Sequence, residues 1–284
     1  MFIWLASYPK SGNTLLRALL ASYFFSKDGI FDFELIKNIK QFPQIGLFEN
    51  LGIDVTNEKE VIKNYINVQA SINKKKSIQF LKTHSYLFNI DNNPFTDLNN
   101  SLGAIYIVRD PRNVLISYAH HNNISIKDTA EIMINSINYG GNLKTDNISD
   151  KTKVYMGSWS SNFHSWKSFK SPGKYLLVKY EDLVNDKEKT FYKILNFIYK
   201  LNKSNLSIDK NKIKNMIETT SFKNMQALEK KEGFIESKIN IKTGKKIPFF
   251  NLGPKNTWKN ILDEEIRKKI EISFRDEMIE LGYL

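Results

Sequence analysis

The sequence predicts an α/β protein, a three-layer sandwich in which helices cover both faces of a central parallel sheet. Two observations lead to this fold class. Short apolar runs recur along the chain, and segments with helical spacing of apolar residues lie between them. Continuous apolar runs of about four to eight residues are typical of strands buried on both faces. Strands that alternate with helices favour a parallel sheet.

Each expected element follows from one such pattern. The predicted strands are the apolar runs Phe2–Ala6, Ile78–Leu81, Ala104–Val108 and Tyr175–Val178. Helical spacing predicts helices from Leu15 to Phe24, from Phe191 to Ile198 and, as one long C-terminal helix, from Ile261 to Met278. Because no internal repeat and no linker rich in proline, glycine or serine divides the chain, we expect a single domain over residues 1–284.

The composition narrows the classes of protein that fit. A formal charge of +12 permits an anionic partner, but the lysines are spread along the chain, which favours a solvated basic surface over a nucleic-acid site. The absence of cysteine excludes disulfides and thiolate metal sites. No apolar segment approaches the ~18 residues of a membrane span, and the N-terminus lacks the basic start of a signal peptide. We therefore expect a cytoplasmic protein without a membrane span.

A candidate anion site follows the first predicted strand. The stretch Ser7–Thr14 leads directly into a predicted helix, whose first N–H groups lack partners and whose dipole places positive charge there. Lys10 adds a full charge, and Gly12 permits a close approach of the backbone. The lysine precedes the glycine and the loop is short, so this stretch is not a Walker A motif.

A second candidate anion site follows the third predicted strand, which ends at Arg109. The next residues, Asp110 and Pro111, indicate the start of a helix, with Ser117 eight residues after the arginine. Arg109 can donate two parallel N–H groups to a phosphate. A local ion pair between Arg109 and Asp110 is the alternative interpretation. We expect Arg112 to lie on the surface.

These stretches resemble the motifs of the sulfotransferase family that uses 3′-phosphoadenylyl sulfate (PAPS). Tyr8–Thr14 is similar to the family's 5′-phosphosulfate loop, and Arg109 with Ser117 has the spacing of its 3′-phosphate motif. Three further stretches resemble family motifs in the family's order: Tyr180–Asp182, Thr220–Met225 and Gly253–Asn260. The chain is thereby identified as a member of the cytosolic type, from a bacterium, with a P-loop-like nucleotide-binding fold.

The resemblance implies PAPS as the sulfuryl donor and requires no metal. It implies a set of donor-binding residues, namely Lys10, Ser11, Gly12, Asn13, Thr14, Arg109, Ser117, Tyr180, Thr220, Phe222 and Gly253. The chain departs from the family in two places. Leu15 replaces a tryptophan that stacks on adenine in many members, and Asn251–Leu252 replaces a basic pair at the 3′-phosphate, for which Lys255 is a candidate substitute.

A candidate general base follows the second predicted strand. Lys82, Thr83 and His84 come directly after this apolar run, where open α/β sheets place their sites. A histidine has a pKa suited to removing a proton near neutrality. The family has a Lys-Thr-His element here, which implies that His84 deprotonates the acceptor while Lys82 and Lys10 assist the transfer.

The other histidines carry weaker predictions. His120 and His121 are neighbours on a predicted helix, so their side chains point about 100° apart and cannot easily share a metal ion. We expect one of them to line a pocket.

The sequence therefore predicts in-line transfer of a sulfuryl group from PAPS to a hydroxyl or amine of a small-molecule acceptor, without nucleic-acid partners. Two alternatives remain: a P-loop-type nucleotide kinase or ATPase, and a non-enzymatic basic nucleic-acid-binding protein. The sequence does not determine the acceptor or the oligomeric state. For the acceptor pocket we expect residues 41–51, residues 86–95 and the loop before Asn251, with apolar walls from Phe42, Phe48, Phe88 and Phe95. The stretch from Glu232 to Asn251 is expected to be one long loop.

Overall fold

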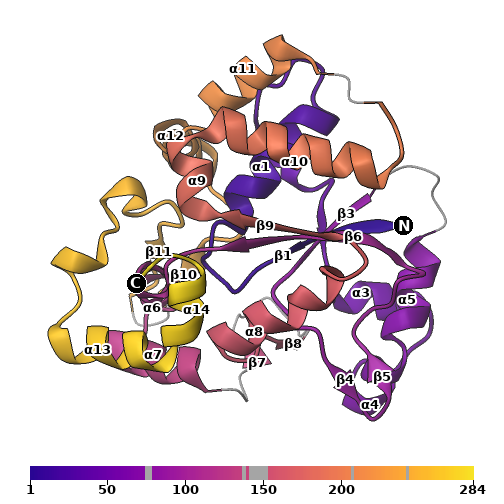
Figure 1. Cartoon of the computed structure of the whole chain (residues 1–284), viewed down its shortest axis with the longest axis horizontal. Helices are drawn as coiled ribbons and strands as arrows, with labels where there is room; N and C mark the ends of the chain where they lie inside the picture. Colours follow the sequence, from indigo (N-terminus) through magenta and orange to yellow (C-terminus); the bar gives the residue numbers. More distant parts are fainter. Residues whose placement is uncertain (74–78, 136–138, 141–152, 206–207, 241–242) are drawn as a thin grey trace.

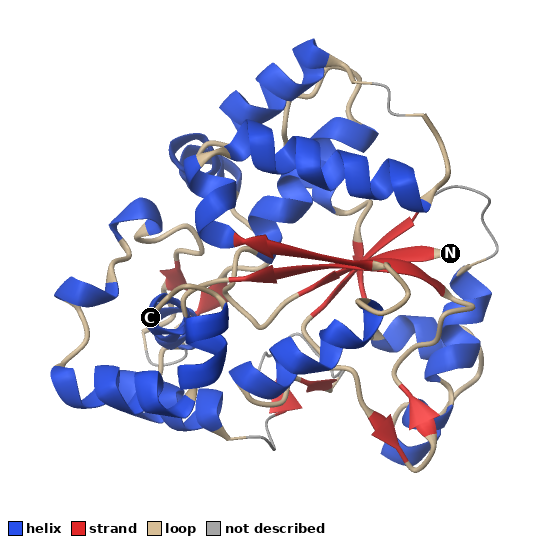
Figure 2. Ribbon diagram, viewed as in Figure 1, coloured by secondary structure: helices blue, strands red, loops and turns tan. Residues whose placement is uncertain are grey.

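Five parallel strands form the central sheet of the protein. The computed structural model describes residues 1–73, 79–135, 139–140, 153–205, 208–240 and 243–284. The strand order is β2-β3-β1-β6-β9, and every pair is parallel. The strands are β1 (Phe2–Ala6), β2 (Lys40–Gln41), β3 (Gln79–Thr83), β6 (Ser101–Val108) and β9 (Tyr175–Lys179). Figure 2 shows this sheet nearly edge-on between two layers of helices, which confirms the predicted fold class.

The four predicted strands are confirmed, although Ile78 lies outside the described residues. Strand β1 shows why continuous apolar runs are needed. Its residues Phe2, Trp4 and Ala6 pack into one hydrophobic cluster, whereas Ile3 and Leu5 pack into another on the opposite face. Side chains alternate between the faces of a strand, so a strand covered on both faces has no polar positions.

Helices that lie between and after the strands in the sequence form the two layers (Figure 1). One layer holds α1 (Asn13–Phe25), α9 (Tyr180–Asn185), α10 (Lys187–Leu201), α11 (Lys210–Thr219) and α12 (Phe222–Glu232). The other holds α3 (Ile45–Glu49), α4 (Glu58–Lys63), α5 (Tyr65–Ile72), α6 (Pro111–Asn122), α7 (Ile126–Ile134), α8 (Trp159–Trp166), α13 (Glu264–Ser273) and α14 (Arg275–Glu280).

The remaining elements are short: α2 (Phe33–Ile36), β4 (Asn89–Ile90), β5 (Asn93–Pro94), β7 (Tyr139–Gly140), β8 (Val154–Tyr155), β10 (Lys238–Ile239), β11 (Lys246–Ile247) and 3₁₀ turns at Lys167–Phe169, Gly253–Lys255 and Trp258–Asn260. No helix within the described ranges is long and apolar enough to cross a membrane.

Two predicted elements differ from the structure. The single C-terminal helix is instead α13 and α14, separated at Phe274, whose φ of −123° and ψ of 26° interrupt the helical path. The predicted loop of residues 232–251 contains the antiparallel hairpin β10–β11. Figure 1 shows this hairpin beside the carboxyl ends of the central strands.

The predicted apolar walls of the acceptor pocket belong to the core. Phe42, Phe48, Phe88 and Phe95 are each at most 5 % exposed. They form one aromatic cluster: the Phe95 ring centroid lies 5.3 Å from that of Trp4 and 5.5 Å from that of Phe88. Rings buried to this extent stabilise the fold and present no surface to an acceptor.

Phe95→Ala should therefore destabilise the protein by about 3–5 kcal/mol, because it removes a fully buried ring and leaves a cavity. Urea unfolding would measure the change. Leu98→Ala is the matched control, since this neighbouring side chain is 50 % exposed and its truncation should be nearly neutral. Equal midpoints for the two variants would contradict the placement of Phe95 in the core.

Candidate active site

The predicted site motifs converge where three central strands end. The loop after β1 runs from Ser7 to Gly12, His84 follows β3, and Arg109 follows β6. The Ser7 carbonyl oxygen lies 2.9 Å from His84 Nδ1, and Arg109 donates from Nη1 to the Lys10 carbonyl oxygen at 3.3 Å. Three segments far apart in the sequence are thus joined around one loop.

The backbone of this loop has a shape that favours glycine. Gly12, the N-cap of α1, has a φ of +104°, and Lys10 has a φ of +65°. A Cβ atom at Gly12 would lie 2.4 Å from the Tyr180 ring, so only glycine lets this ring pack on the loop. No side chain caps α1. Its first N–H groups therefore face the loop, as an anion site requires.

The side chain of Asn13 holds the loop in place. Its amide donates to the Leu5 carbonyl oxygen at 2.9 Å and to the Ser7 hydroxyl at 3.2 Å. These contacts tie the start of α1 to the end of β1. The side chain thus supports the loop, and its backbone N–H is what remains for an anion.

Buried donors without partners mark the same place. Among the described residues, the Ser11 hydroxyl and Arg109 Nε are buried and have no hydrogen-bond partner. Buried polar groups in proteins are nearly always paired, so unpaired donors in two segments that contact each other indicate a ligand site. The Arg109 guanidinium also lies 4.4 Å from the centre of the Tyr180 ring, which fixes its orientation.

Asp110 pairs with Arg112, contrary to the alternative in which it pairs with Arg109. One of its carboxylate oxygens lies 2.8 Å from Arg112 Nη2, and the other accepts from the Arg112 backbone N–H at 2.9 Å. The surface position expected for Arg112 is also wrong. Its side chain is 6 % exposed, pairs with Glu271 at 2.6 Å and lies 4.0 Å from the Trp258 ring.

Phe222 and Gly253, two residues predicted to contact the donor, lie against each other. A Cβ atom at Gly253 would lie 2.5 Å from the Phe222 ring, so these two residues touch. Leu15 packs in the same cluster as Phe222. The side chain of Thr220 is buried, and its hydroxyl donates to the Met216 carbonyl oxygen at 2.6 Å. Ser117 lies half-buried on α6.

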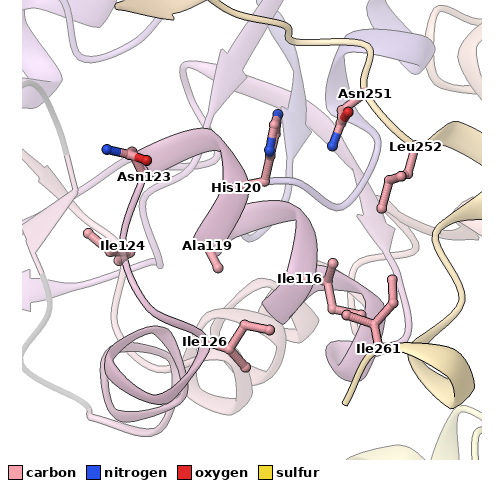
Figure 3. A pocket seen from close by; sticks show the side chains of 9 residues that line it. All are labelled: Ile116, Ala119, His120, Asn123, Ile124, Ile126, Asn251, Leu252 and Ile261. Carbon is pink, nitrogen blue, oxygen red and sulfur yellow. The ribbon is translucent and has the colours of Figure 1, made fainter. Parts of the chain in front are cut away.

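Asn251 and Leu252, which replace the basic pair, line a cavity together with residues of α6. The cavity has a volume of about 320 Å³. Figure 3 shows these two side chains across from Ile116, Ala119 and His120. The replacement therefore places an apolar and a neutral polar side chain at this cavity and brings no positive charge there. Lys255, the candidate substitute, is exposed.

The two neighbouring histidines face different surroundings. His120 lines this cavity, and its Nε2 lies 3.1 Å from the Pro248 carbonyl oxygen. The His121 ring lies 5.5 Å from that of Phe249. Burial, together with the nearby Lys10 charge, lowers the pKa of His121 to about 2. His120 thus lines a cavity, as expected for one of the pair, while His121 lies towards Lys10.

The electrostatics of the site keep His84 neutral. Burial and the Lys82 charge lower its pKa to about 3. The Ser7 carbonyl oxygen can only accept a hydrogen bond, so Nδ1 at 2.9 Å must carry the proton of the neutral ring. Nε2 is then left with its lone pair, so it is the atom that can accept a proton. The His84 pKa of about 3 differs from the value near neutrality that the sequence led us to expect, because burial and the Lys82 charge disfavour the charged ring.

Lys10 is perturbed by the same crowding of charge. Burial, together with nearby cations that include Lys82 and Arg109, lowers its pKa to about 7, and Glu236 opposes this shift. Its Nζ lies 3.6 Å from the centre of the Phe249 ring. An anion that binds beside this buried lysine would favour its charged form and raise its pKa.

Glu236 and Arg17 are site residues that the sequence motifs do not contain. The Glu236 carboxylate accepts from Thr14 Oγ1 at 3.1 Å, from Lys82 Nζ at 3.2 Å and from Arg17 Nη1. Burial opposes its charge, but Lys82 and Arg17 hold the pKa of Glu236 well below the ordinary value. Arg17 follows Thr14 by three residues on α1, and that spacing on one helix face is the signal that could have found it.

Comparison with known proteins identifies the family. The family model described as a sulfotransferase domain matches residues 2–282. The chain belongs to the sulfotransferase family. The family recognised from the motifs is thereby confirmed.

Relatives and solved structures agree with this family. The luciferin sulfotransferase of Photinus pyralis is 26 % identical over 282 residues, which cover 95 % of this chain and 69 % of that protein. Sulfotransferase 1E1 of Mus musculus is 23 % identical over 277 residues, covering 96 % and 82 %. Mouse sulfotransferase SULT7A1 complexed with PAP shares the fold with a TM-score of 0.59 at 19 % identity, covering 98 % of this chain and 84 % of that one. A retinol dehydratase in complex with retinol and PAP has a TM-score of 0.60 at 17 % identity, covering 98 % and 81 %.

We expect the His84 ring to remain neutral, with its proton on Nδ1, at pH 5, where an ordinary histidine with a pKa of about 6.5 is mostly charged. Nitrogen NMR of histidine-labelled protein would detect this, and His84→Gln would assign the signal. The unfolded chain takes up this proton below pH ~6.5, whereas the folded protein takes it up only near pH 3. This group therefore makes stability fall as the pH falls through that window. A His84 ring that is charged at pH 5 would contradict the assignment.

Proposed function

We propose that the protein transfers a sulfuryl group from PAPS to a hydroxyl or amine of a small-molecule acceptor, with residues 1–284 acting as one sulfotransferase domain. One observation carries the proposal: a neutral histidine, a helix N-terminus with Lys10, and the unpaired donor of Arg109 meet at one edge of the sheet. SULT7A1 was solved in complex with PAP, and retinol dehydratase was solved in complex with retinol and PAP and in complex with androsterone and PAP. These relatives support a nucleotide donor and a small acceptor.

The donor would lie across the carboxyl ends of β1 and β6. Its phosphosulfate end would bind the backbone N–H groups of residues 11–14 together with the Ser11 hydroxyl and Lys10, all at the start of α1. Its 3′-phosphate would bind Arg109, whose guanidinium the Tyr180 ring orients, and Ser117 on α6.

The adenine ring would lie near the touching pair Phe222 and Gly253. Leu15 packs in the same cluster as Phe222, so it would offer the base an apolar contact where other members offer a stacked ring. Because the Thr220 hydroxyl already donates within α11, we expect Thr220 to shape this wall and to contribute only the remaining lone pair of its oxygen.

The reaction follows from these positions. Nε2 of His84 takes the proton of the acceptor group while that group's oxygen or nitrogen attacks sulfur. The bond between sulfur and the 5′-phosphate oxygen breaks, and the leaving phosphate takes the electron pair. Lys10 and the N–H groups of α1 stabilise the charge on that oxygen. The Ser7 carbonyl oxygen, at 2.9 Å from Nδ1, holds the ring as it becomes charged.

The two alternative functions receive less support. A magnesium-dependent kinase or ATPase needs a carboxylate at the strand end, and the Asp110 carboxylate is engaged by Arg112 at 2.8 Å and by the start of α6. A basic nucleic-acid-binding protein would not need a neutral histidine beside an anion site. A magnesium requirement for turnover would favour the first, and steeply salt-dependent binding to any duplex would favour the second.

PAP is 3′-phosphoadenosine 5′-phosphate, the donor without its sulfuryl group. Arg109→Ala should weaken its binding by about 2–4 kcal/mol, because a desolvated guanidinium–phosphate contact is lost. Calorimetry with PAP and with adenosine 5′-phosphate would measure this. The wild type should strongly prefer PAP, and the variant should lose most of that preference. Equal affinity of the wild type for the two nucleotides would overturn the assignment of the 3′-phosphate to Arg109.

His84→Ala should lower turnover by about 10²–10⁴-fold while PAP affinity changes little, because a general base acts on the acceptor and not on the donor. Turnover is measured by mass spectrometry as the gain of one sulfuryl group on members of an acceptor panel. An acidic phenol, which is already ionised, should be less affected than an alcohol. Unchanged turnover with all acceptors would assign the base to another residue, with His121 the next candidate.

A further inference from the structure

A carboxylate of the protein itself lies within the proposed donor site. Glu236 comes from the segment between α12 and β10, and it contacts Thr14, Arg17 and Lys82. These partners are 222, 219 and 154 residues away in the sequence, so tertiary structure alone brings them together. We call Thr14, Arg17 and Lys82 the anion cluster.

The contacts of Glu236 resemble those that an anionic ligand would make. A hydroxyl donates to one carboxylate oxygen at 3.1 Å, and two cations lie against the other. Sulfuryl and phosphate oxygens accept the same donors with the same sign of charge. The proposed donor binds with its phosphosulfate end at residues 11–14, which include Thr14, and the family resemblance implies that Lys82 assists the transfer. The carboxylate therefore holds two side chains that lie where the charged end of the donor is proposed to bind.

Arg17 needs another anionic partner if the Glu236 carboxylate moves away. Its side chain is 7 % exposed, and among the described residues its Nε is buried without a hydrogen-bond partner. A buried cation that loses the carboxylate with which it pairs is strongly disfavoured. An incoming anion that pairs with Arg17 would remove that cost and would also satisfy Nε.

The exchange would involve the side chain of Glu236, because its backbone is held on both sides. Phe234, two residues earlier, is 8 % exposed and packs with Phe249 and Phe250. Ser237, the next residue, donates from its hydroxyl to Glu229 at 2.5 Å and from its backbone N–H to the Phe234 carbonyl oxygen at 3.0 Å. A rotation of the Glu236 side chain would withdraw the carboxylate without disturbing these contacts.

We propose that Glu236 competes with the anionic end of the sulfuryl donor for the anion cluster, and that Arg17 becomes a donor-binding residue when the donor displaces Glu236. The inference rests on the proposed function, because PAPS is the donor that defines the competing anion. It adds a binding residue and an internal competitor to the motifs of that site.

Glu236→Gln tests the competition, because the amide keeps the shape of the side chain and removes its charge. If the carboxylate holds the cluster in nine molecules of ten, the variant should bind PAP roughly tenfold more tightly. Glu232→Gln is the matched control: this glutamate is the last residue of α12, four residues before Glu236, and it is exposed and pairs with Lys231 at 3.1 Å. Its PAP affinity should equal that of the wild type. Calorimetry measures all three proteins.

Arg17 is tested in the background of Glu236→Gln, so that no buried charge is left alone. The double variant Arg17→Gln/Glu236→Gln should bind PAP at least tenfold more weakly than Glu236→Gln alone. An equal affinity of the two would show that Arg17 only pairs with Glu236 and would overturn its role as a donor-binding residue. Weaker binding by Glu236→Gln than by the wild type would show that Glu236 helps to build the site, and this would overturn the competition.

A second readout separates this inference from the proposed function. Inorganic sulfate should raise the thermal unfolding temperature of Glu236→Gln more than that of the wild type, because the cluster is then open to a simple anion. If neither the wild type nor its variants bind PAP, but sulfate stabilises Glu236→Gln more than the wild type, the proposed donor is wrong while the competition at the cluster stands. If PAP binds the wild type and Glu236→Gln equally and Arg109→Ala weakens it, the proposed function stands and the inference fails.

Discussion

The gathering of like charges at one sheet edge is the constraint on which this structure depends. Parallel strands end on the same side, so Lys82 near the end of β3 comes close to Lys10 and Arg109, which follow β1 and β6. Burial and the neighbouring cations disfavour the charged form of Lys10 and lower its pKa to about 7. The chain offsets the repulsion with a carboxylate and with the faces of Phe249 and Tyr180.

The residues of the motifs divide into those that keep unpaired donors and those that hold the loop and the helices together. The Ser11 hydroxyl and Arg109 Nε keep unpaired donors. Asn13, by contrast, ties a strand end to a helix start, and Arg112 joins α6 to Glu271 and to the Tyr283 carbonyl oxygen. Residues of one motif therefore have different roles. Substitution of Ser11 or Arg109 should change ligand binding, whereas substitution of Asn13 or Arg112 should change the stability of the site.

Local patterns made much of the fold and site predictable from the sequence. Apolar runs identified the four longer strands, and the loop at Lys10 follows one of them directly. Long-range packing was not predictable. Glu236 and Arg17 meet across 219 residues, and Arg112 is buried only because Asp110, Glu271 and Trp258 surround it. The phenylalanines expected around an acceptor lie in the core, because aromatic residues of a wall and of a core share one pattern.

The tethering of Glu236 has a consequence for which anions the protein admits. A carboxylate attached to the chain acts at an effective concentration that a dissolved ion must exceed, on the order of millimolar for short flexible connections. A small anion in the surrounding solution gains only the contacts of Thr14, Arg17 and Lys82, which the carboxylate already makes. A nucleotide that also reaches Arg109 gains contacts that no small ion can make. If the proposed competition holds, the site selects for ligands that reach both the anion cluster and Arg109, and the Glu236 carboxylate sets the affinity that such a ligand must exceed.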